Sequence, residues 1–167
     1  MKKLLIIISL FMTSILGFAN VKPLDVDITE GAKLPNFELR DFHGKYIKSK
    51  KIFGSKKPTL LIFASEWCPH CQKELPEVQK LYNENKDTMN VVVIFRRKNT
   101  NLTNTKKYVK ENNFTFPVYY DASNELTEAF HVKSVPYNLI IQNSRIQKDL
   151  GGSKNYEELK EAFYLNY

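Results

Sequence analysis

Two cysteines, Cys68 and Cys71, have the residue type and spacing that most directly indicate chemistry in this chain. Thiol–disulfide exchange needs one thiolate that attacks a disulfide and a second thiol that resolves the mixed disulfide. A pair separated by two residues supplies both groups when it stands at the start of a helix. Because unpaired N–H groups and the helix dipole favour a negatively charged sulfur there, we predict that Cys68 attacks and Cys71 resolves.

The two residues between the cysteines fit this interpretation. Pro69 suits the first turn of a helix, where its missing N–H costs nothing, and the helix is expected to run to about Asn85. His70 places a positive charge or a hydrogen-bond donor near the Cys68 sulfur. That would stabilise the dithiol form and make the protein a stronger oxidant.

The elements that must position this pair are strands and helices in alternation. An unbroken apolar run, 59–64, predicts a strand buried on both faces directly before the motif, and 91–95 predicts a second one. The other expected strands are 34–39 and 46–48 as a hairpin, 116–120, 137–141 and 145–150, and the other expected helices are 105–113, 124–130 and 155–164. Residues 49–58 are predicted to form a loop.

This order of elements predicts an α/β sandwich. The first strand–helix–strand unit should cross over with a right hand, which makes its two strands parallel. The chain has 167 residues, 43% of them hydrophobic, and shows neither an internal repeat nor a linker. We therefore expect one folded domain over 34–167, preceded by a polar, flexible segment at 20–33.

The unit of buried strand, Trp67-Cys68, Cys71 and helix resembles the thioredoxin superfamily. Over most of residues 34–165 the chain resembles the exported TlpA/ResA-type thiol–disulfide oxidoreductases. The resemblance implies a three-layer thioredoxin-like sandwich: a mixed central sheet flanked by helices, with an N-terminal β-hairpin and an inserted strand–helix unit.

The same resemblance implies further site residues. Pro136, in Ser134-Val135-Pro136, corresponds to the cis-proline of the fold, and the backbone of Val135 would pair with the bound substrate chain. Trp67 would cover the site. Glu74 corresponds to a buried glutamate that acts on the cysteines; burial would raise its pKa and let it accept the proton of the resolving thiol.

The direction of electron flow is the main open question. Ile62 occupies the position where plain thioredoxins have a buried Asp, and Tyr137-Asn138 replaces threonines that are common in the group. Pro69-His70 is the dipeptide of the disulfide donor DsbA, whereas Glu74 is typical of the reducing ResA-like proteins. The similarity of the whole chain slightly favours a reductant, with a DsbA-like disulfide donor as the alternative.

Other functions remain as alternatives. A peroxiredoxin-type peroxidase would carry a Thr-x-x-Cys pattern, but Ser65 stands at the Thr position. A Cu(I)-binding protein could use both cysteines with one of the histidines His43, His70 and His131. A structural disulfide would close a loop too short to stabilise the fold much. We expect neither a metal nor an organic cofactor.

The first 19 residues have the layout of a secretory signal peptide. Lys2-Lys3 is followed by an apolar run from Leu4 to Leu16 and by small residues up to Ala19. The run is shorter than the ~20 apolar residues of a comfortable membrane span, so an uncleaved membrane anchor is the alternative. Cleavage would lower the net charge from +7 to +5. The protein is expected in the periplasm or on the extracytoplasmic face of the cell membrane.

The distribution of charged residues gives little information about the partners of the protein. Lysines are spread along the chain, with short runs such as 48–51 and 96–98, which is typical of a solvated basic surface and not of a nucleic-acid-binding module. The expected partners are exported proteins with thiols or disulfides, and a membrane redox partner that resets the cysteine pair.

Overall fold

A mixed five-stranded sheet forms the centre of the domain in the computed structural model, which describes residues 22–164. The strands lie in the order β5-β4-β3-β6-β7, with bounds β3 (Thr59–Ala64), β4 (Asn90–Arg96), β5 (Val118–Asp121), β6 (Tyr137–Gln142) and β7 (Arg145–Gly151). Strands β3, β4 and β5 are parallel, and β6 and β7 are antiparallel to their neighbours. All six residues of β3 are buried, as the unbroken apolar run predicts.

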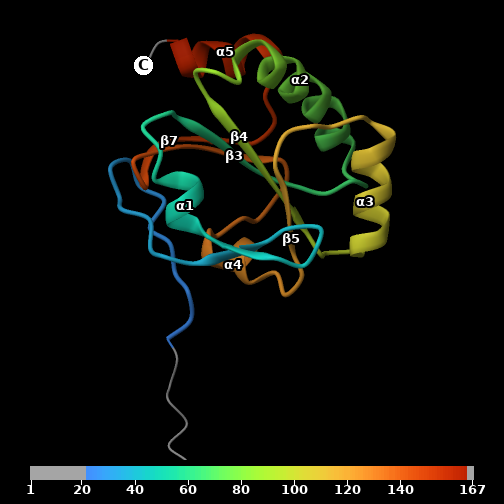
Figure 1. Ribbon diagram of the computed structural model, residues 1–167, viewed down its shortest axis with the longest axis horizontal. Helices are drawn as coiled ribbons and strands as arrows, with labels where there is room; N and C mark the ends of the chain where they lie inside the picture. Colours follow the sequence, from blue (N-terminus) through green and yellow to red (C-terminus); the bar gives the residue numbers. More distant parts are fainter. Residues whose placement is uncertain (1–21, 165–167) are drawn as a thin grey trace, which may run out of the picture.

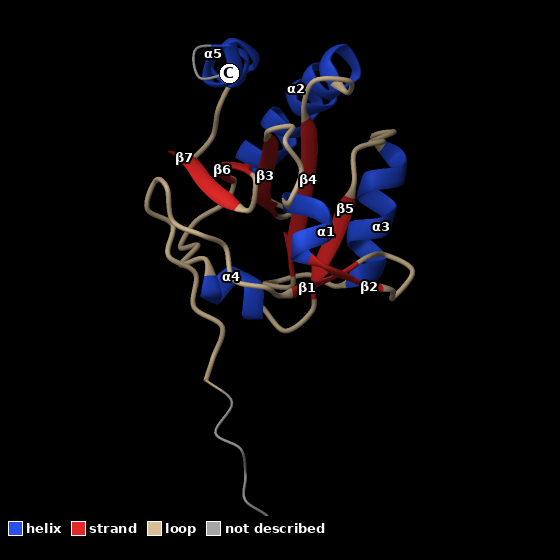
Figure 2. Ribbon diagram, turned by 60° about the vertical axis from the view of Figure 1, so that its left-hand side comes forward, coloured by secondary structure: helices blue, strands red, loops and turns tan. Residues whose placement is uncertain are grey.

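Helices cover both faces of this sheet, so the expected three-layer sandwich is confirmed. Three longer helices follow one face, and two short ones lie on the other (Figures 1 and 2). The longer helices are α2 (Pro69–Asn85), α3 (Leu102–Glu111) and α5 (Tyr156–Tyr164), and the short ones are α1 (Ser49–Phe53) and α4 (Glu125–Ala129). α2 and α5 lie side by side, which places the start of α5 near the motif helix.

Aromatic side chains fill the two apolar layers. On one face Phe63 of β3 packs against Phe130, which follows α4, with ring centroids 5.2 Å apart. On the other face Phe95 of β4 packs against Tyr108 of α3 at 6.2 Å. Because successive strand residues point to opposite faces, alternate positions of the buried strands supply both layers and hold the helices firmly in place.

The N-terminal part of the described chain packs against this body. β1 (Glu38–Arg40) and β2 (Tyr46–Lys48) form the expected hairpin. Before it, Val26 is fully buried and its N–H donates to the carbonyl of Ala129 at 3.0 Å. The segment predicted to be flexible, 20–33, therefore follows the domain surface in its described part. The expected signal peptide, residues 1–19, lies outside the described residues.

The loop predicted over 49–58 is wrong in its first half, because residues Ser49–Phe53 form α1. Phe53 is only 1% exposed, and the Ser49 hydroxyl accepts a hydrogen bond from the backbone N–H of Phe37 at 3.0 Å. These tertiary contacts stabilise a helix too short to form alone. Within residues 22–164, no helix has the length and apolar character needed to cross a membrane.

Candidate active site

Cys68 lies between the end of strand β3 and the start of helix α2. β3 ends at Ala64, a short turn follows, and Cys68 is the residue that precedes the first helical position, Pro69. Its thiol is 5% exposed and donates a hydrogen bond to the backbone carbonyl of Val135 at 3.3 Å. The predicted attacking sulfur is thus held at the rim of the domain, next to unpaired N–H groups of the helix start.

Cys71 lies one helical turn further on and is fully buried. Both cysteines are free thiols in this structure. Burial raises the pKa of the Cys71 thiol strongly, and the neighbouring Cys68 and Glu74 raise it further. Cys71 is therefore a protonated thiol that cannot attack until another group takes its proton.

The loop of Val135 and Pro136 leads into β6, the antiparallel neighbour of β3, and so lies beside the end of β3 and the motif. The peptide bond between these two residues is cis, as the family resemblance implies. Val135 is 8% exposed and its carbonyl receives the Cys68 hydrogen bond. The structure therefore brings together the two landmarks of the sequence, which are 67 residues apart.

Glu74 lies in the interior of the domain, on the same helix as Cys71. Its side chain is 1% exposed, and one carboxyl oxygen, Oε2, accepts a hydrogen bond from the backbone N–H of Lys154 at 2.7 Å. The other oxygen, Oε1, is buried and has no hydrogen-bond partner among the described residues. Burial raises the pKa of Glu74. A carboxyl that is reluctant to ionise beside a buried thiol can exchange protons with it.

Trp67 and His70 lie at the exposed rim. Trp67 is 41% exposed, and its indole Nε1 donates to the carbonyl of Lys98 at 2.9 Å, which fixes the ring against the loop after β4. The Arg96 guanidinium lies 6.0 Å from the indole ring centre. His70 is exposed in the first turn of α2. Both residues are placed where an approaching partner could touch them.

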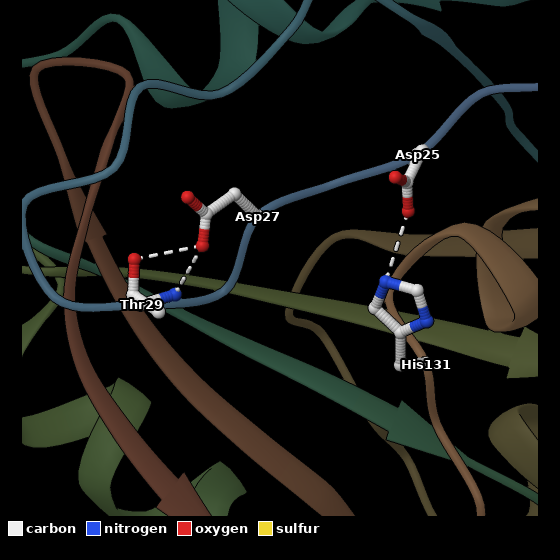
Figure 3. A network of polar contacts seen from close by, with 4 residues as sticks. All are labelled: Asp25, Asp27, Thr29 and His131. Atoms are coloured by element: carbon white, nitrogen blue, oxygen red, sulfur yellow. Dashed lines mark hydrogen bonds and ion pairs between the residues drawn. The ribbon is translucent and has the colours of Figure 1, made fainter.

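The two histidines outside the motif serve other contacts. His131 Nε2 pairs with Asp25 Oδ1 at 2.9 Å, which ties the N-terminal segment to the loop after α4 (Figure 3). His43 is exposed in the turn between β1 and β2. Within the part of the chain that the structure describes, no cluster of three His, Cys, Asp or Glu side chains could hold a metal ion.

Comparison with known proteins decides the family. The AhpC/TSA family model matches residues 31–148, which is most of the chain. The protein belongs to the AhpC/TSA family. Within this family it is a thiol–disulfide oxidoreductase of the ResA type, with the thioredoxin-like fold that its geometry indicates.

Named relatives of this AhpC/TSA protein carry that activity in their names. The chain is 31% identical to the sporulation thiol-disulfide oxidoreductase A of Bacillus subtilis over 134 residues, covering 75% of this chain and 76% of the relative. It is 29% identical to the thiol-disulfide oxidoreductase ResA of Bacillus thuringiensis over 132 residues, 78% and 75% of the two chains. The crystal structure of StoA from Bacillus subtilis superposes with a TM-score of 0.65 at 28% identity, covering 76% of this chain and 95% of that one.

The sequence reasoning gave no role to three polar residues around the site of this AhpC/TSA protein. Burial raises the pKa of Glu66, whose Oε2 is buried without a partner in the described chain, although Oε1 accepts a hydrogen bond from Thr100. Burial and the nearby Cys71 raise the pKa of Tyr108 to about 12. Asn138 is fully buried. Asn138 carried the one available signal, a polar residue inside an apolar strand pattern.

The two thiols are expected to react at very different rates with iodoacetamide. Because only the thiolate reacts and Cys71 is both fully buried and raised in pKa, we expect it to be alkylated about tenfold or more slowly than Cys68 near neutral pH. Mass spectrometry of peptides from the reduced protein, sampled over time, measures both rates. Equal rates would contradict the assignment of Cys71 as the protected, resolving thiol.

Proposed function

We propose that this thiol–disulfide oxidoreductase acts outside the cytoplasm as a reductant of disulfides in exported proteins, with Cys68 as the nucleophile. The observation that carries the proposal is the Cys68 thiol at the start of α2, hydrogen-bonded to Val135 and one turn before the buried Cys71. A substrate chain that pairs with the Val135 backbone would displace the thiol proton from that carbonyl and lie directly against the sulfur.

The reaction has two exchange steps. The Cys68 thiolate attacks one sulfur of the substrate disulfide; a mixed disulfide forms, and the second substrate sulfur leaves as a thiolate. Cys71 then gives its proton to Glu74 and attacks the Cys68 sulfur, which releases the first substrate sulfur. The enzyme ends with a Cys68–Cys71 disulfide, the substrate gains two electrons, and Glu74 passes its proton to a leaving thiolate.

The environment of the cysteine pair favours the reducing direction. A strongly oxidising dithiol owes its potential to a stabilised thiolate. Here burial raises the pKa of Cys71, and an ionised Glu74 adds to that effect. A negative charge on Cys71 or on the carboxyl beside it is thus disfavoured. His70 in the first turn of α2 acts in the opposite sense, so the alternative of a DsbA-like disulfide donor rests on the dipeptide Pro69-His70.

Export rests on residues 1–19, whose two lysines, apolar run and small residues predict a cleavable signal. The mature chain would begin at Asn20 in the periplasm or on the outer face of the cell membrane. Sequencing the N-terminus of the protein recovered from cell fractions tests this: a chain that still begins at Met1 in the cytoplasmic fraction would contradict it.

The reduction potential of the Cys68–Cys71 pair is the measurement that tests the direction. Equilibration with glutathione buffers, read from the fraction of alkylated protein, should give a value near that of thioredoxin, about −270 mV. A value of about −120 mV would instead support disulfide donation. Failure to exchange with any disulfide, including that of insulin, would remove the proposed function altogether. A membrane protein that returns electrons to the pair is the expected partner.

A further inference from the structure

The loop between β7 and α5 lies over the Glu74 carboxyl. The backbone N–H of Lys154 donates to Glu74 Oε2 at 2.7 Å, and the Ser153 hydroxyl adds a weaker interaction with the carboxyl. Both interactions favour the ionised form of Glu74 and lower its pKa, against the larger opposing effect of burial. The position of this loop therefore influences when Glu74 holds a proton.

Asn138 fixes the start of the same loop. It lies on β6, two residues after Pro136, opposite Ile62 of β3, and is fully buried. Its side-chain Nδ2 donates to the carbonyl of Gly152 at 3.1 Å and to that of Gly151 at 3.4 Å. Gly151 is the last residue of β7, paired with Asn138 in the sheet, and has a φ of 70°. Because glycines have wide backbone freedom, the side chain of Asn138 adds a restraint at the point where this pairing ends.

The carboxylate has few other sources of stabilisation. Glu74 Oε1 is buried and has no hydrogen-bond partner within residues 22–164. The charged or titratable groups that act on Glu74 are Lys154, on the α5 side, and Cys71 on its own helix, whereas the strand beneath contributes Asn138, which is uncharged at every pH. The Asn138 side chain also helps to lower the pKa of the carboxyl. Replacing Asn138 would thus remove both its restraint on the loop and its own lowering effect on the pKa of Glu74.

We propose that Asn138 is a positioning residue for proton transfer: it holds the end of β7 and the following residues 152–154 so that the Lys154 N–H stays on Glu74, the group that accepts the Cys71 proton. This inference rests on the proposed function and adds to it a residue of β6. The stretch 135–138 then serves the site at both ends. Val135 receives the Cys68 thiol, and Asn138 holds the partner of the buried acid.

The variant Asn138→Leu tests this role because leucine has a similar size and cannot form hydrogen bonds. The expected result is that Glu74 ionises at higher pH than in the unmodified protein, since its carboxylate loses stabilising donors. A hydrogen bond to a charged group changes the equilibrium constant for ionisation about tenfold or more. Resolution by Cys71 near neutral pH should therefore slow about tenfold. The ¹³C resonance of the Glu74 carboxyl in the reduced protein, assigned through its absence in Glu74→Gln, reports the titration directly.

Tyr137→Phe is the matched control. It removes the hydrogen bond from the Tyr137 hydroxyl to Asp149, 2.6 Å long, and so loosens the same strand end. The Asp149 carboxylate still accepts the Gly151 N–H, and Asn138 keeps both of its own hydrogen bonds. The Glu74 titration should remain where it is in this variant. An equal shift in both variants, or none in Asn138→Leu, would overturn the inference.

Two further arms keep the test decisive. If Asn138→Leu fails to fold, Asn138→Thr, whose hydroxyl is a shorter donor, should shift the titration in the same direction; no shift would count against the inference. The titration is measured on the reduced protein without substrate, whereas the proposed function is tested by disulfide exchange of the unmodified protein. Failure of one therefore does not resemble failure of the other.

Discussion

Replacing Cys71 by serine is expected to convert the protein from a catalyst into a trap for its substrates. Cys68 can still attack a disulfide, but no second thiol remains to release the mixed disulfide, so the covalent complex accumulates. Replacing Cys68 by serine should instead reduce exchange to the uncatalysed background. Insulin reduction measures turnover, and non-reducing electrophoresis followed by mass spectrometry identifies the trapped complexes and the cysteine that holds them.

A matched variant is needed because position 71 is fully buried. A buried serine hydroxyl without a partner costs about 1–3 kcal/mol of stability, so Cys71→Ser could lose activity partly by unfolding. Cys71→Ala leaves no polar group behind and should trap the same complexes. Multiple turnovers by both Cys71 variants, or trapping by Cys68→Ser, would show that the roles of the two sulfurs are different from those assigned.

The order of the elements could be predicted because their signals are local. The run 59–64 is apolar at every position and became β3, and Pro69 begins α2 as its fixed φ favours. α1 could not be predicted. Its five residues include the two lysines Lys50 and Lys51, and the helix depends on the burial of Phe53, whose ring packs against Phe37 outside the helix. A short helix has too little propensity of its own to leave a sequence signal.

The candidate site likewise has a part that local sequence signals predict and a part that they do not. The spacing of Cys68 and Cys71 predicts their chemistry without reference to any other part of the chain. The contact of Cys68 with Val135 follows from the family resemblance alone, since nothing local connects residues 67 positions apart. The Lys154 N–H on Glu74 could not be predicted by either route, because a backbone donor looks the same at every residue.

Glu74→Gln is expected to slow the resolution step while it leaves the first attack by Cys68 nearly unchanged. Glutamine has the same shape and its carbonyl can still accept the Lys154 N–H, but it cannot take a proton. General base catalysis by a positioned carboxylate contributes about 100-fold or more, so release of a preformed mixed disulfide should slow by about that factor near neutral pH. Rapid-quench measurements on a mixed disulfide with a chromogenic thiol separate this step from the first.

The pH dependence gives this prediction a second, independent readout. In the unmodified enzyme the resolution rate should rise with pH as Glu74 ionises, and this rise should be missing in Glu74→Gln. A variant with the same pH profile as the unmodified enzyme would show that another group takes the Cys71 proton. Glu66, half-buried two residues before Cys68 and also raised in pKa by burial, would then be the next candidate.

Stability should change with pH in the direction set by the same carboxyl. Burial raises the pKa of Glu74, so the folded chain holds this proton more tightly than the unfolded chain. Its contribution to the free energy of unfolding is therefore fully present below the ordinary glutamate pKa of about 4.3 and is lost as pH rises through the higher folded value. Glu74→Gln has no such loss, so urea unfolding of the reduced proteins between about pH 4 and pH 8 should show the variant gaining stability relative to the unmodified enzyme as pH rises. The group that transfers the proton thus reduces stability at the pH where it works, as expected of a buried acid kept for its chemistry.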